Sequence, residues 1–222
     1  MNYYKLSNYC TDPSEMGTFP QLAKWLKRAD WEKVYSGIEG ELPNNWQTPI
    51  VALHPKAKLT TQLTGILLAP VVLTLKKSFV KFLQDFDLPP HKTWPIHLVH
   101  RDQDIHDYLL FHISDPIDYE LIDIEKSSFY AAEGIPYGGK LEGELIQIKD
   151  AEEYKRVKLE LKYENSSRSL YSSPAVFDFD RTTYDLIRMT NEPHLGYFVS
   201  QKLKDAIEEY GVTGIGWEEM SY

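Results

Sequence analysis

The clearest alternation of hydrophobic and polar residues lies near the C-terminal end of the chain. Three apolar residues at 197–199 lead into Ser200, a residue type that often caps a helix N-terminus. Gly211 suits the left-handed position that ends many helices. The pattern predicts a strand, a helix and a return strand across 197–217, with Trp217 buried together with the inner helix face. Apolar residues recur at helical spacing between the two caps: Leu203, Ala206, Ile207 and Tyr210.

Helical spacing also appears twice in the first half of the chain. A segment that starts at Pro20 has basic residues on one side and apolar residues on the other, which predicts a helix over 20–29. A second stripe predicts a helix over 78–83, stopped by Pro89 and Pro90. The apolar positions of these two segments are Leu22, Trp25, Leu26 and Ala29 in the first, and Phe79, Phe82 and Leu83 in the second.

Short apolar or alternating runs predict strands along the rest of the chain. A polar turn at 101–104 separates two of these runs and predicts an antiparallel hairpin between 94–99 and 108–113. A polar loop is expected at 165–169. The predicted strands cover residues 1–6, 94–99, 108–113, 119–124, 141–148, 157–163, 176–179 and 186–189.

Few helices separated by runs of strands are typical of an α+β fold. We therefore expect one domain over 1–222, built on a mostly antiparallel sheet with a few packed helices. The 222 residues are enough for one good core, and the hydrophobic content of 42% is too high for intrinsic disorder.

Cysteine use and hydropathy indicate the compartment. The single Cys10 excludes an intramolecular disulfide, and residues 1–7 lack the apolar segment of a secretory signal. The longest apolar run, 65–73, is interrupted by Pro70 and is far shorter than the roughly 20 residues that span a bilayer. We expect a cytoplasmic protein that does not enter membranes.

The net charge of −9 is concentrated in the middle of the chain. Residues 1–83 carry +4, residues 84–164 carry −9 and residues 165–222 carry −4. Such an acidic surface disfavours nucleic-acid binding and favours a basic protein partner through long-range attraction, although acidity also serves solubility alone.

Four histidines within sixteen positions suggest a metal site, but their spacing argues against one. His97 and His100 on a strand point to opposite faces, and neither a cysteine pair nor a helical HExxH motif completes a tetrahedron. His106 and His112 complete the group. We predict no metal, no cofactor and no catalytic residues.

Two further features have alternative interpretations. Asp178 and Asp180 would share one face of a strand, as an acid/base pair or as a solvated face opposite the aromatic side chains. Trp46, in a polar Asn-Asn-Trp loop, is either a contact for a partner or a core residue.

Six short segments of the chain form an ordered set: 3–6, 73–79, 107–111, 121–127, 184–188 and 199–214. Similar segments appear in the same order in a family of bacterial immunity proteins, the eleventh in the polymorphic-toxin series, once catalogued as a domain of unknown function. The chain resembles this family, most strongly over 199–214. The resemblance implies a protein that is encoded beside a toxin and that binds and neutralises this toxin; it implies no enzyme activity.

Charge and resemblance together nominate a binding surface for the cognate toxin. Beside Trp46, the nominated residues are the acidic side chains of Asp115, Asp118, Glu120, Asp123 and Glu125. Two rival hypotheses stay open: a small hydrolase or transferase that uses the central Asp/His cluster, and an adaptor protein without a toxin.

Overall fold

The computed structural model describes residues 2–7, 13–28, 47–65, 72–113, 117–133, 143–165, 167–189 and 196–218. The chain divides into two compact units, and each is described by itself. The first unit comprises Met1–Pro116, Tyr184–Arg188 and Gly196–Met220, and the second comprises Ile117–Thr183, Met189–Leu195 and Ser221–Tyr222. The prediction of one domain over 1–222 stays a prediction.

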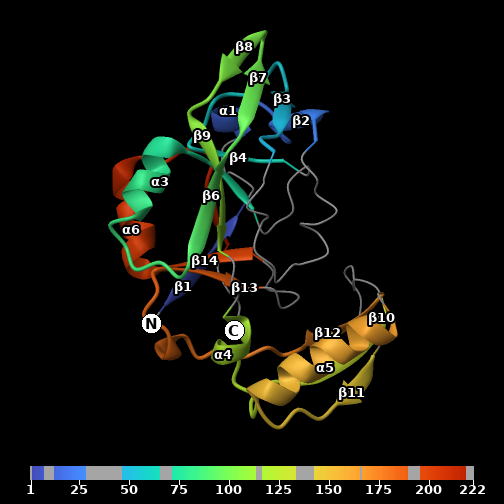
Figure 1. Ribbon diagram of the computed structural model, residues 1–222. Coiled ribbons are helices and arrows are strands. Elements are labelled where there is room, and N and C mark those ends of the chain that lie inside the picture. The colour runs from blue at the N-terminus through green and yellow to red at the C-terminus, as the bar shows by residue number, and fades with distance from the viewer. Residues whose placement is uncertain are drawn as a thin grey trace. The chain divides into compact units, whose positions relative to one another are not determined.

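The predicted α+β class is confirmed. Within the described residues, five α-helices and fifteen strands form four sheets, and almost all strand pairs are antiparallel (Figure 1). Helices are few, as the sequence pattern predicts, and the strands are divided among four small sheets instead of the single sheet that was expected.

Strand β1 forms the middle of a sheet with the order β13-β14-β1-β15. It is antiparallel to both β14 and β15, which helix α6 connects. The predicted strand, helix and return strand are therefore confirmed, with β1 inserted between the two strands. The bounds are β1 Tyr3–Ser7, β13 Leu186–Met189, β14 Gly196–Ser200, α6 Gln201–Tyr210 and β15 Gly216–Glu218.

Both predicted caps of α6 are present. The Ser200 hydroxyl accepts a hydrogen bond from the Leu203 amide at 3.2 Å. Gly211 ends the helix with φ 72°, in the left-handed region that costs glycine least. Leu203 and Ile207 are buried, and Trp217 packs partly buried against the same core.

A second sheet repeats this arrangement with the order β4-β5-β9-β6. Helix α3 connects β5 to β6, and the antiparallel β9 lies between these two strands. The predicted helix near 78–83 is confirmed. The bounds are β4 Gln62–Leu63, β5 Leu73–Lys76, α3 Lys77–Leu83, β6 His91–Pro95 and β9 Tyr108–Ile113.

Helices α3 and α6 lie side by side (Figure 1) and contribute to one hydrophobic core with strands of both sheets. Burial of each large aliphatic or aromatic side chain there contributes about 1.5–3 kcal/mol. The core contains Leu6, Leu73, Leu75, Phe79, Val80, Leu83, Phe111, Ile113, Leu186, Tyr197, Val199, Leu203 and Ile207.

The third sheet corrects two predictions in the first unit. The segment predicted as a helix from Pro20 is strand β2, because it pairs with β3 through an irregular ladder that the local apolar spacing does not reveal. The order is β2-β3-β7-β8, and β3 and β7 are parallel. The bounds are α1 Pro13–Met16, β2 Leu22–Lys27, β3 Ile50–Leu53, β7 His97–His100 and β8 Gln103–Ile105.

The turn of the predicted hairpin is present, but the strand that follows it is β8 and not the predicted segment 108–113. Arg101 and Asp102, both with positive φ, connect β7 to β8 instead of to β9. Strand β9 pairs with β6 in the other sheet, because the chain changes sheets at Ile96 between β6 and β7.

The second unit contains the sheet β11-β10-β12 and helices α4, α5 and η1. Three predicted strands are wrong here. Residues 157–163 belong to α5, residues 119–121 to the short α4, and Phe179 to the 3-10 helix η1. The bounds are α4 Asp118–Leu121, β10 Phe129–Glu133, β11 Glu144–Ile146, α5 Ala151–Glu164, β12 Arg168–Ser172 and η1 Phe179–Arg181.

Helix α5 forms in spite of its alternating apolar residues because its start and its charges favour a helix. The Asp150 carboxylate accepts a hydrogen bond from the Glu153 amide at 2.8 Å, as an N-cap does. Arg156 pairs with Glu153 at 2.9 Å and with Glu160 at 3.0 Å, spacings of three and four residues that only a helix brings together.

Candidate functional site: an acidic surface of the second unit

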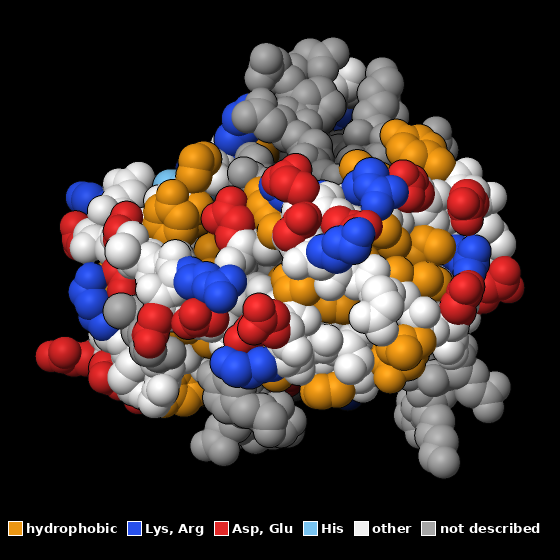
Figure 2. Space-filling view, turned by 90° about the horizontal axis from the view of Figure 1, so that it is seen from below, with side chains coloured by type: hydrophobic (Ala, Val, Ile, Leu, Met, Phe, Trp, Pro, Cys, Tyr) orange, Lys and Arg blue, Asp and Glu red, His pale blue; other side chains and the backbone are white. Residues whose placement is uncertain are grey.

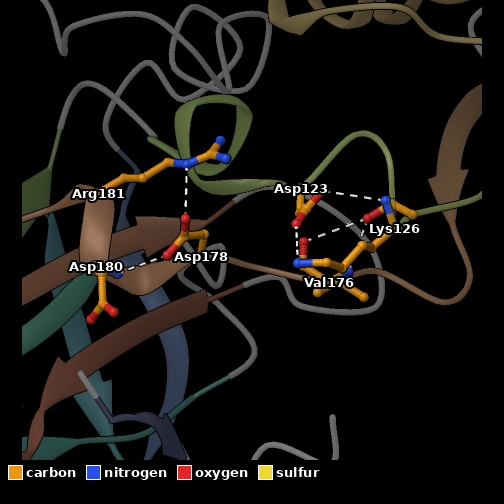
Figure 3. A network of polar contacts seen from close by, with 7 residues as sticks. Asp123, Lys126, Val176, Asp178, Asp180 and Arg181 are labelled. Atoms are coloured by element: carbon orange, nitrogen blue, oxygen red, sulfur yellow. Dashed lines mark hydrogen bonds and ion pairs between the residues drawn. The ribbon is translucent and has the colours of Figure 1, made fainter.

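Two segments that are far apart in the sequence lie side by side in the second unit. Ile122 and Phe177 form an isolated antiparallel bridge. The Asp123 amide donates to the Val176 carbonyl at 2.8 Å (Figure 3). The Asp178 amide donates to the Leu121 carbonyl at the same distance. The acidic residues after Leu121 therefore lie beside those after Phe177.

Asp123 is held in place by Lys126. The Lys126 ammonium lies 2.8 Å from Asp123 Oδ2, and the Lys126 amide donates to Oδ1 at 3.2 Å. The side-chain hydrogen bond from Lys126 lowers the pKa of Asp123, and Asp123 in turn raises the pKa of Lys126. Asp123 is therefore ionised, and its position is set by the backbone as well as by its partner.

Asp178 is held in a similar way by the turn that follows it. Its Oδ1 accepts a hydrogen bond from the Asp180 amide at 3.2 Å, and its Oδ2 lies 3.1 Å from Arg181 Nε (Figure 3). The negative charge of Asp178 also contributes to the raised pKa of Lys126, which places the two acidic segments within electrostatic reach of each other.

We define the acidic surface as Glu120, Asp123, Glu125, Asp178 and Asp180, five carboxylates interspersed with the two cations Lys126 and Arg181. Glu120, Glu125 and Asp180 are exposed. Two ion pairs between described residues lie on this surface, Lys126 with Asp123 and Arg181 with Asp178. Neither of these two pairs includes Glu120 or Glu125. Acidic side chains also appear next to basic and hydrophobic ones on the face shown in Figure 2.

The structure brings together half of the nominated binding residues. Glu120, Asp123 and Glu125 belong to the acidic surface. Trp46 and Asp115 lie outside the described residues, as does the side chain of Asp118. Asp178 and Asp180 join the surface through contacts between residues about fifty positions apart, which the sequence pattern does not reveal.

A hollow of about 620 Å³ lies at the end of α5 in the same unit. Arg168 bridges its two sides, with Glu144 and Glu164 each 3.3 Å away, and Asn165 donates to Glu133 at 3.1 Å. The charged groups that surround it neutralise one another in part. Its lining residues are Ala131, Ala132, Glu133, Gly143, Glu144, Glu164, Asn165 and Arg168.

The four central histidines do not gather at one point. His97 and His100 alternate in burial along β7, as predicted for opposite faces. His97 Nε2 lies 2.6 Å from Asp104 Oδ1, and its ring is 4.6 Å from that of His106. His112 lies on β9 in another sheet. Across the described ranges, no three histidine, cysteine, aspartate or glutamate side chains are arranged to hold a metal ion.

No protein-family model matches the chain, and a search of curated protein sequences finds no match. Among the helices that the structure describes, none combines the length and hydrophobicity needed to cross a bilayer.

Proposed function

We propose that the chain is a binding protein of the immunity class, which neutralises a cognate bacterial toxin by capturing a basic region of that toxin. The observation that carries this proposal is the pairing of 121–123 with 176–178, which brings the acidic segment 120–125 beside Asp178 and Asp180.

The two held carboxylates and the three exposed ones have different roles in this proposal. Asp123 and Asp178 are ordered before a partner arrives, so little side-chain entropy is lost when they bind. Glu120, Glu125 and Asp180 are exposed and extend the negative field toward solvent. A field of this kind raises association rates for a basic partner and weakens as salt is added.

The assignment to toxin neutralisation rests on the resemblance to immunity protein family eleven, above all over 199–214. The structured part of that likeness is the strand, helix and return strand around β1, which is a scaffold and holds no catalytic group in this proposal. Binding would therefore be stoichiometric, and its specificity would reside on surfaces such as the acidic one.

The test begins with the gene beside this one. Its product is expressed alone and together with this chain, and cell growth is measured. Association kinetics between the two purified proteins then follow at low and high ionic strength. We expect growth arrest that this chain relieves, and an association rate that falls with salt.

Charge reversal locates the binding surface. Glu120→Lys and Glu125→Lys should each slow association, whereas Asp107→Lys, an equal charge change on an exposed residue of the first unit, should have a smaller effect. Equal rates for all three variants would reject the acidic surface. A neighbouring protein without toxicity would favour the adaptor hypothesis.

A further inference from the structure

The turn between β7 and β8 in the first unit has an unusual backbone. Arg101 and Asp102 have φ values of 52° and 64°, so both lie in the left-handed region. His100 pairs with Gln103 across them, which makes a two-residue hairpin turn of the kind that requires positive φ at both positions. Asn-Gly makes such turns at little cost, whereas a long side chain is uncommon there. The turn therefore carries an arginine at a position that the backbone alone would leave to a smaller residue.

Contacts of the flanking side chains hold this turn in place. Arg101 Nε donates to the Pro55 carbonyl at 2.9 Å, and His100 Nε2 lies 3.4 Å from the same oxygen. Across the two strands, His97 Nε2 lies 2.6 Å from Asp104 Oδ1. A backbone conformation that costs energy persists only where the surrounding structure fixes it, and such positions cluster at functional sites. The turn is therefore formed before any partner arrives.

The tip of this hairpin exposes two polar side chains, Asp102 and Gln103. Residues 101–104 are all exposed, and the turn lies at the upper end of the first unit in Figure 1. No hydrogen bond or ion pair among the described residues involves either of these two side chains. A carboxylate accepts hydrogen bonds, and a carboxamide both accepts and donates them. Both groups are therefore available to a partner.

Charge does not select the partner of this hairpin, because groups of both signs surround the tip. Long-range attraction favours neither a basic nor an acidic molecule here, so selection falls to shape and to directed hydrogen bonds. A narrow, convex and preformed turn fits a concave site, such as a cleft lined by N–H and O–H donors. Over residues 54–56 and 97–107, the exposed charged residues are Lys56, Arg101, Asp102, Asp104 and Asp107.

We infer that the turn between β7 and β8 inserts into a cleft of the cognate toxin, as a second contact beside the acidic surface of the second unit. This inference rests on the proposed function, because the toxin is the partner. Inside the cleft, Asp102 would accept hydrogen bonds and Gln103 would both accept and donate them. Contacts between groups that are already ordered mainly slow dissociation, whereas the acidic surface mainly speeds association.

Substitutions at Asp102 distinguish a role in binding from a role in folding. Asp102→Gly removes the carboxylate and supplies the residue that this turn position favours. Its melting temperature should therefore equal that of the wild type or rise by about 1–3 °C. Its complex with the product of the neighbouring gene should nevertheless dissociate about tenfold faster.

Two asparagine variants isolate the charge. Asp102→Asn keeps a residue type that tolerates positive φ and should also speed dissociation. Asp107→Asn, the same change at another exposed aspartate of the first unit, is the matched control and should leave the dissociation rate unchanged.

The dependence on salt separates this inference from the proposed function. The association rate of Asp102→Gly should fall with ionic strength as that of the wild type does, because the acidic surface is intact. If the wild type binds with this salt dependence and neither Asp102 variant dissociates faster, the inference is overturned and the proposed function stands. Faster dissociation together with a lower melting temperature shows a structural role and also overturns the inference. A wild type that does not bind the neighbouring product overturns both.

Discussion

The Asp185 carboxylate and the Ser200 hydroxyl are joined by a 2.7 Å hydrogen bond at the start of α6. Ser200 donates to Asp185 and accepts from the Leu203 amide, so one hydroxyl connects the helix cap to a buried carboxylate. The other Asp185 oxygen accepts from Lys202 at 2.7 Å and from the Asp87 amide at 3.1 Å. A single buried charge thus organises the end of β14, the start of α6 and the turn after α3.

This charge makes stability depend on pH. Burial alone would raise the pKa of Asp185, but the hydrogen bonds from Lys202, Ser200 and the Asp87 amide outweigh it and lower the pKa below the ordinary 3.8. A lowered pKa in the folded state contributes stability above pH 3.8, and that stability is lost as pH falls through the folded-state value.

The corresponding test compares Asp185→Asn with the wild type. Asparagine removes the charge, so at neutral pH the variant should lose about 1–3 kcal/mol of unfolding free energy. Urea melts at pH 7 and below pH 3.8 measure the difference, which should shrink on acidification. A difference that is the same at both pH values would show that Asp185 contributes through shape and not through charge.

Leu203→Ala and Lys204→Ala test the packing of α6. Leu203 is fully buried in the shared core, so its truncation should cost about 2–5 kcal/mol. Lys204 makes a partly exposed ion pair with Glu208, and its ammonium lies over the rings of Tyr4 and Trp217, so its loss should cost about 1 kcal/mol. Denaturant melts give both values; similar small losses would show that the inner face of α6 is not packed.

Alanine substitutions at Gly211 and Gly214 distinguish the cost of backbone strain alone from the cost of strain together with a steric clash. Both have positive φ, 72° and 79°, where a side chain is disfavoured by about 1 kcal/mol or more. A Cβ at Gly211 meets nothing within 4 Å, whereas one at Gly214 would lie 2.3 Å from the Gln62 carbonyl oxygen. Gly214→Ala should therefore destabilise roughly 1–3 kcal/mol more than Gly211→Ala in thermal melts. Equal losses would mean that the loop before β15 relaxes freely.

Substitution of the N-cap residue of α5 tests how much this cap stabilises the helix, which lies where the sequence pattern predicted a strand. Asp150→Ala removes the acceptor of the Glu153 amide and should cost about 1 kcal/mol. Glu152→Ala, also near the helix start, removes only an exposed pair with Lys155 and should cost a few tenths of a kcal/mol at most. If chemical denaturation gives no difference between the two variants, the cap contributes nothing to the second unit.

The correct predictions from sequence are those in which local signals agree. For α6, the serine cap, the apolar stripe and the glycine stop all favour the same helix, and tertiary packing adds to them. Residues 157–163 satisfy two periods at once, because Val157, Leu159, Leu161 and Tyr163 alternate while their charged neighbours pair at helical spacing. Asp150 is the local signal that favours the helix.

Three of the five residues of the acidic surface could be predicted from the sequence, for a related reason. Glu120, Asp123 and Glu125 are close in sequence, so charge counting identifies them. Asp178 and Asp180 join them through backbone pairing between segments that β10, β11, α5 and β12 separate along the chain, and no local pattern encodes that register. The strand at β2 was missed likewise, since only its ladder with β3 distinguishes it from a helix.

The position of β1 between β14 and β15 has a consequence for how the chain folds. Its contacts join positions more than 200 residues apart, as in the hydrogen bond from Ser7 to Glu218 across 211 residues. Closing so large a loop costs entropy before any packing is gained, so proteins rich in such contacts fold slowly. During synthesis, β1 leaves the ribosome early and has both edges unpaired until the partners of its sheet emerge. We therefore expect a nascent chain that depends on chaperones or on dilute conditions until β15 is available to close the sheet.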